Sequence, residues 1–165
     1  MTIVEKLRKG VTTRSARQTR ALAAELAAVL PPVATLALHG DMGVGKTTFV
    51  QGLARGLGVP ERVTSPTFAI YSVHEGGQRP LIHLDAYRLE NEQQIEALLL
   101  EEFLVSPYCL AVEWPGKISA WLPADAWHLT LSIENDNRHR VLLMQGPLPP
   151  AGPQPWRRLI NGPGT

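Results

Sequence analysis

The chain has 165 residues, of which 44% are hydrophobic and 19% charged, and its formal net charge is +1. These values are typical of one globular domain that buries a core without disulfides or structural metal. A charge this small excludes a surface that is basic as a whole, so it gives no sign of direct binding to nucleic acid or membranes. Cys109 is the only cysteine, which excludes an internal disulfide and favours a reducing compartment.

The N-terminal sequence MTIVEKLRKG contains no continuous apolar stretch of the kind that secretory signals need. No apolar run approaches the ~20 residues of a membrane-spanning helix. We therefore expect a cytoplasmic protein that has no contact with a membrane.

The first predicted helix begins at Ser15, since this hydroxyl and Gln18 three residues later form a capping box. It ends before Pro31 and Pro32, because a residue that precedes proline is disfavoured in the α region. Residues 1–14 are mostly polar, and we expect them to form a flexible N-terminus. Residues 146–165 hold six prolines and four glycines, so we expect a disordered tail there.

Between these ends, strands and helices alternate. The apolar run VATLALH at 33–39 predicts a buried strand, and the helix after the glycine-rich loop is expected to end at Gly58. The remaining predicted elements are strands at 67–73 and 81–85 paired as a hairpin, an amphipathic helix at 91–104, and strands at 109–113, 127–133 and 140–144. This order predicts one α/β domain over 15–145, a P-loop NTPase-like mixed sheet flanked by helices.

The segment from Gly40 to Thr47, GDMGVGKT, matches the phosphate-binding pattern G-x-x-x-x-G-K-[ST]. Its glycines let several backbone N–H groups converge on one anion, and the following helix adds its positive end. Lys46 supplies a point charge for the β- and γ-phosphates, and Thr47 supplies a hydroxyl for Mg²⁺. The sequence therefore predicts that ATP or ADP binds with magnesium. The expected nucleotide-binding residues in the loop are Asp41, Met42, Gly43, Val44, Gly45, Lys46, Thr47 and Thr48.

Two acids end predicted buried strands: Asp85 after LIHL and Glu113 after CLAV. Sites in open α/β sheets lie at this edge of the strands. One acid is expected to hold the metal and the other to position the attacking water, but spacing alone does not assign the two roles. His83 lies on the same face as Asp85 and is interpreted as a packed, hydrogen-bonded histidine. Arg88 is either a phosphate clamp or a surface charge.

Four blocks together resemble the TsaE family, also called YjeE, of bacterial P-loop ATPases in tRNA threonylcarbamoyladenosine synthesis. They are GDMGVGKTTFVQGLARGLG, VTSPTFAIY, HLDAYRL and VEWP, in the family's order between Ser15 and Met144. The resemblance implies a Mg-dependent ATPase of low activity without partners. It is expected to reset a complex of the TsaD and TsaB proteins, which puts threonylcarbamoyl on adenosine 37 of tRNAs reading codons that begin with A, so that tRNA is met only through the complex.

By matching position, the resemblance makes Thr47 and Glu113 the magnesium ligands and Asp85 the acid needed for hydrolysis. Lys46 is also expected to be needed for hydrolysis, because it supplies the charge that holds the phosphates. It also places switch-like elements near the γ-phosphate at Ser65, Thr67 and Trp114, and brings Thr19 and Arg138 near the nucleotide. One departure is local: Leu98-Leu99 stands where the family commonly has leucine-glycine, which makes the helix geometry there uncertain.

Three rival functions share the phosphate loop. A small-molecule or nucleoside kinase usually has a lid with several arginines, yet Arg88 is the one arginine in the sequence between Tyr87 and Trp127. A regulatory GTPase would carry Asn-Lys-x-Asp for guanine, and this string is absent. A nucleotide-binding module without turnover is disfavoured by the two well-placed acids.

Overall fold

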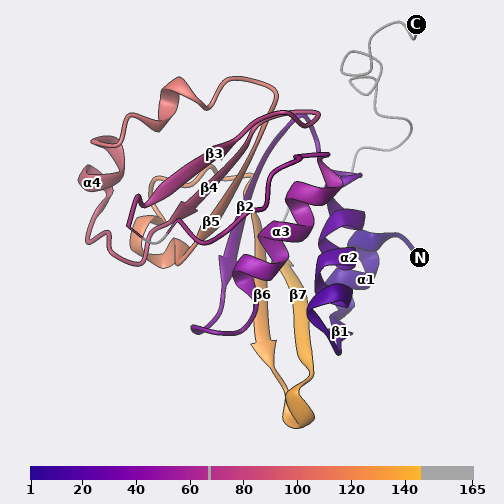
Figure 1. Ribbon diagram of the computed structural model, residues 1–165. Coiled ribbons are helices and arrows are strands. Elements are labelled where there is room, and N and C mark those ends of the chain that lie inside the picture. The colour runs from indigo at the N-terminus through magenta and orange to yellow at the C-terminus, as the bar shows by residue number, and fades with distance from the viewer. Residues whose placement is uncertain (67, 146–165) are drawn as a thin grey trace, which may run out of the picture.

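The computed structural model describes residues 1–66 and 68–145 (Figure 1). Its centre is a seven-stranded sheet in the order β1-β7-β6-β2-β5-β4-β3. The strands are β1 (Val11–Thr13), β2 (Val33–His39), β3 (Tyr71–His74), β4 (Leu81–Asp85), β5 (Tyr108–Glu113), β6 (Trp127–Ile133) and β7 (His139–Gln145). The helices are α1 (Ile3–Lys9), α2 (Ala16–Ala27), α3 (Lys46–Gly56) and α4 (Glu92–Glu96), and the 3-10 helices are η1 (Leu100–Glu102), η2 (Pro115–Ile118) and η3 (Asn135–Asn137).

Four neighbouring strands in the middle of the sheet are parallel. β2 pairs in parallel with β5 and with β6, and β5 pairs in parallel with β4. β3, β7 and β1 join the two sides in antiparallel pairs. The predicted mixed α/β sheet and the hairpin of β3 and β4 are thereby confirmed. β2 lies between two parallel neighbours, so both of its faces are buried and its apolar sequence has no polar alternation.

Each face of the sheet has its own hydrophobic core. On one face, the apolar sides of α1, α2 and α3 pack on the sheet, with Leu7, Leu26 and Phe49 fully buried. On the other face, Ile95 of α4 and Ile118 of η2 pack on Ile82 and other outward residues of β4 and β5. Figure 1 shows α1–α3 gathered on one side and α4 on the opposite side. This layering leaves the carboxyl ends of β2, β4 and β5 open at one edge.

α2 and α3 pack side by side at close range through two glycines. A Cβ on Gly52 would lie 2.4 Å from the Arg20 carbonyl oxygen, and one on Gly56 would lie 2.7 Å from that of Ala24. Real Cβ atoms do not approach so closely, so both positions require glycine. α2 therefore fixes the position of α3, and with it the end of the glycine-rich loop.

The predicted start of α2 at Ser15 is confirmed, but the predicted capping box is only half formed. The Ser15 hydroxyl accepts a hydrogen bond of 3.1 Å from the Gln18 backbone N–H. The Gln18 side chain, however, accepts from the Arg14 N–H at 2.7 Å, one residue before the position that a capping box uses. The strands predicted at 33–39, 81–85 and 127–133 have the observed bounds. α3 ends at Gly56, two residues before the predicted end, and Gly58 follows with a φ of 76°.

The expectation of a flexible segment over residues 1–14 was wrong. Thr2 and Glu5 form a complete capping box that starts α1. Ile3, Val4 and Leu7 are buried against the sheet, and β1 pairs with β7. The sequence T-I-V-E contains the capping pattern that starts a helix. The charged residues around it lie on the solvent side, and they made the segment look like a polar, flexible one.

Two further predictions differ from the structure. The strand predicted at 67–73 begins only at Tyr71, because the N–H groups of Ala69 and Ile70 turn back to the Pro66 carbonyl oxygen. The helix predicted at 91–104 is interrupted after α4, where Leu99 adopts a left-handed φ of 54° before η1 begins. The predicted tail at 146–165 and Thr67 lie outside the described residues.

Within the described part of the chain, no helix combines the length and the apolar character that crossing a bilayer requires.

We predict that Leu99→Gly stabilises the protein. The left-handed conformation is unfavourable for a residue with a Cβ, and Leu99 is 62% exposed, so its side chain contributes little packing. Since glycine also gains freedom in the unfolded chain, the net rise in unfolding free energy should be about 0.5–1 kcal/mol. Urea denaturation measures it. Leu98→Gly is the matched control and should lower stability, because Leu98 packs against the second core and has no positive φ.

Candidate nucleotide site

The glycine-rich loop joins the end of β2 to the start of α3. Gly40 has a φ of 145°, and a Cβ there would lie 2.4 Å from the Leu131 carbonyl oxygen. Gly45 has a φ of 101° and is the N-cap of α3, so no side chain caps the first turn of this helix. The N–H groups of that turn are left for an external anion, as at phosphate-binding helix ends.

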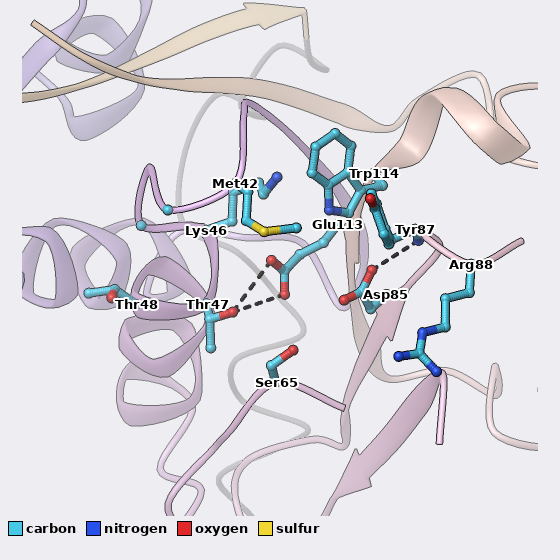
Figure 2. A pocket seen from close by; sticks show the side chains of 12 residues that line it. Met42, Lys46, Thr47, Thr48, Ser65, Asp85, Tyr87, Arg88, Glu113 and Trp114 are labelled. Carbon is cyan, nitrogen blue, oxygen red and sulfur yellow. Dashed lines mark hydrogen bonds between the residues drawn. The ribbon is translucent and has the colours of Figure 1, made fainter. Parts of the chain in front are cut away.

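A cavity of about 510 Å³ opens beside this loop. It lies where the loop, the ends of β4 and β5, and the residues before β3 meet (Figure 2). Its wall is formed by Met42, Gly43, Gly45, Lys46, Thr47, Thr48, Ser65, Asp85, Tyr87, Arg88, Glu113 and Trp114. The structure thus brings together most of the predicted nucleotide-binding residues, both acids and two of the switch-like positions.

Four predicted residues do not line this cavity. Asp41 lines a neighbouring hollow with His39 and Lys117. Val44 is buried, and its carbonyl oxygen accepts a hydrogen bond of 2.8 Å from His139 Nδ1. Thr19 is buried in α2, where its hydroxyl hydrogen-bonds that of Thr13 at 2.7 Å. Arg138 precedes β7 and contacts Asp136 at 3.4 Å.

The two acids lie side by side. Asp85 and Glu113 are register partners in the parallel strands β4 and β5, so they sit on the same face at the carboxyl edge. The Thr47 hydroxyl donates toward the Glu113 carboxylate, with distances of 3.2 Å and 3.4 Å to its two oxygens. Asp85 Oδ1 instead accepts from the Tyr87 backbone N–H at 3.0 Å. The acids therefore have different neighbours: Glu113 faces the loop threonine, and Asp85 contacts the backbone that follows β4.

Lys46 has intramolecular partners in this structure. Its Nζ donates a hydrogen bond to the Gly40 carbonyl oxygen and lies 3.7 Å from the centroid of the Trp114 ring. Burial lowers the pKa of Lys46, and the charges of Glu113, Asp85 and Asp41 oppose this effect. An arriving phosphate would offer stronger, charged partners than a carbonyl and a ring face.

Aromatic side chains form the outer wall. Trp114 has a left-handed φ of 58°, and its ring lies 5.1 Å from that of Tyr87. On the same side, the Arg88 guanidinium lies 4.7 Å over the Phe68 ring, and Phe68 is itself 84% exposed. No sequence pattern singled out Tyr87, although it lies in the HLDAYRL block, two residues after Asp85. Arg88 lines the cavity, which supports a ligand-facing position over a distant surface charge.

The donor set suits magnesium with phosphate. The hydroxyl of Thr47 and the carboxylate of Glu113 are hard oxygen ligands that face each other. Among residues 1–66 and 68–145, no three His, Cys, Asp or Glu side chains gather to hold a metal by themselves. A cation here would complete its shell with substrate phosphate and water, as Mg²⁺ commonly does.

Comparisons with known proteins give the family of the chain. The sequence model of the family described as "Threonylcarbamoyl adenosine biosynthesis protein TsaE" matches residues 13–142. A Bacillus subtilis protein named tRNA threonylcarbamoyladenosine biosynthesis protein TsaE is 37% identical over 129 residues, which are 78% of this chain and 80% of that protein. The Aquifex aeolicus protein of the same name is 35% identical over 138 residues, with coverages of 82% and 96%. The crystal structure of Bacillus subtilis YdiB superposes with a TM-score of 0.67 at 34% identity, over 80% of this chain and 81% of that one.

We predict that Trp114 reports nucleotide binding. When Lys46 moves to the phosphates, the indole loses its cation, so the tryptophan fluorescence should change saturably as ADP is added. Trp114→Phe should abolish this change, while Trp121→Phe, which alters a tryptophan that does not line the cavity, should keep it. A full response in the Trp114→Phe protein would contradict the assignment.

Proposed function

The chain belongs to the TsaE family, whose role lies in tRNA threonylcarbamoyladenosine biosynthesis, and we propose that it is the ATP-hydrolysing component of that system. In this proposal, ATP binding and hydrolysis reset a complex of the TsaD and TsaB proteins between rounds of modification of adenosine 37. The chain meets tRNA only through that complex and works in the cytoplasm.

The observation that carries the proposal is the contact between Thr47 and Glu113, with Asp85 beside it. A hydroxyl at the start of α3 and a carboxylate at the end of β5 converge from two elements that are distant in sequence. Both acids lie on the wall of the cavity that contains the loop. A binding module needs the loop, but it does not need a second acid at the same edge.

In this proposal, different residues of the cavity bind the phosphates, hold the metal and position the attacking water. The amides of Gly43 to Thr48 and the Lys46 ammonium bind the β- and γ-phosphates. Thr47 and Glu113 would hold Mg²⁺, which supplies positive charge against the phosphate oxygens. Asp85 is left to orient a water, or to take its proton, as water attacks the γ-phosphorus and ADP leaves. Positioning and electrostatics supply most of the rate in such reactions.

We expect slow turnover of the isolated chain because few cationic side chains line the cavity. Among the described residues, Arg88 is the only arginine that lines the cavity, and its guanidinium lies against Phe68. A cation that reaches the transferred phosphoryl group often raises phosphoryl-transfer rates by orders of magnitude. We therefore propose that TsaD and TsaB complete the site.

We predict that TsaD and TsaB accelerate hydrolysis by this chain. The chain alone should hydrolyse ATP slowly, and adding TsaD and TsaB together should raise the rate sharply, with ATP but not with GTP. Phosphate release measures it. The Lys46→Ala protein is the negative control and should show no hydrolysis with or without the partners.

An unchanged rate with the partners would contradict the reset role. The cavity would then be tested for phosphoryl transfer to small hydroxylated metabolites, as expected for a kinase.

We predict that substitutions of Glu113 and Asp85 affect hydrolysis in different ways. Glu113→Gln should raise the magnesium concentration needed for half-maximal hydrolysis, because it removes charge from the metal side. Asp85→Asn should instead lower kcat by about 10²-fold or more, at any magnesium concentration, with ADP affinity unchanged. Magnesium titrations of the hydrolysis rate with partners present distinguish them. If the two variants exchange these behaviours, the roles are reversed.

A further inference from the structure

His83 is a completely buried histidine at the back of the site. It lies in β4, two residues before Asp85, on the sheet face that α3 covers, and 0% of it is exposed. Its Nε2 atom lies 2.6 Å from Glu113 Oε2. A buried polar ring requires a partner, and Glu113 provides it.

The direction of this hydrogen bond follows from chemistry. An ionised carboxylate only accepts, so the ring donates through Nε2–H. The other ring nitrogen, Nδ1, has no hydrogen-bond partner in the described part of the chain. The ring is thus held by one polar contact, which points at Glu113.

The contact acts on the carboxylate that faces Thr47. Oε2 of Glu113 accepts from His83 on one side and lies 3.2 Å from the Thr47 hydroxyl on the other. Glu113 is itself only 5% exposed, so water has little access to hold it in place. Without the histidine, the carboxylate would rotate more freely and lose its alignment with Thr47.

We propose that His83 is a positioning residue that holds the Glu113 carboxylate in the orientation needed to bind the metal of the Mg–nucleotide complex. This inference rests on the proposed function, because it takes Thr47 and Glu113 as the metal-binding pair. Outer partners that fix a ligand's orientation typically change metal affinity 10–100-fold when removed.

The test uses Mn²⁺ as a probe in place of Mg²⁺, with the full chain and saturating ADP, and electron paramagnetic resonance to count free Mn²⁺. Two substitutions with side chains of similar length separate the effect of the hydrogen-bond donor from the effect of packing. In His83→Gln, the amide nitrogen reaches about as far as Nε2 and donates. In His83→Met, the side chain fills the space but donates nothing. We expect the Met variant to bind Mn²⁺ 10–100-fold more weakly and the Gln variant to stay close to the parent.

His74→Gln is the matched control. His74 is a buried histidine on neighbouring β3, but its Nε2 contacts the Ser72 hydroxyl at 3.0 Å and not Glu113. It should bind Mn²⁺ as the parent does. Thermal unfolding and ADP affinity in EDTA check that each variant is folded and keeps its loop. If the Met variant does not fold, His83→Asn, whose amide ends short of Nε2, takes its place.

Parent-like Mn²⁺ affinity of a folded Met or Asn variant would overturn the inference, and so would equal weakening by Gln and Met. Glu113→Gln and Thr47→Val show whether the premise holds. If they bind Mn²⁺ as tightly as the parent, the metal assignment in the proposed function fails. If they weaken binding and the Met variant does not, only the role of His83 fails.

Discussion

The parallel pairing of β2, β5 and β4 is the constraint on which the site depends. Parallel strands end at the same edge of a sheet. The loop after β2, Glu113 at the end of β5 and Asp85 at the end of β4 therefore meet, although they are far apart in the sequence. The register between β4 and β5 places the two acids side by side, because Asp85 and Glu113 are directly paired. A slip by one residue would turn either carboxylate to the opposite face of the sheet, away from the loop.

The polar groups of the site already satisfy one another. Lys46 binds the Gly40 carbonyl oxygen and the face of Trp114, and Thr47 donates to Glu113. A bound nucleotide would therefore replace these intramolecular contacts of Lys46 and Thr47. The loop is also held from behind, since His139 of β7 donates to the Val44 carbonyl oxygen. Strands on both sides of β2 thus support the site, from β7 to β4.

Leu99 and residues 1–14 show where reading the sequence falls short. The apolar spacing of 91–104 fits a continuous helix, but the chain must return to β5, and it turns at Leu99 in a conformation that suits glycine. The replacement of the family's leucine-glycine by Leu98-Leu99 pointed to this position, but it did not predict the left-handed turn. In α1, the capping box and three apolar residues were visible in the sequence, yet their burial depends on packing against β7, which lies near the other end of the described chain.

The sequence by itself determined the phosphate loop, the mixed α/β order, the strands that precede both acids, and the family. These features are local, since glycine positions, capping residues and apolar runs act over a few residues. Only the tertiary structure decided which acid faces Thr47, that Thr19 and Arg138 do not line the cavity, and that His83 contacts Glu113. Those facts depend on strand register and on layer packing, which join residues that the sequence keeps far apart.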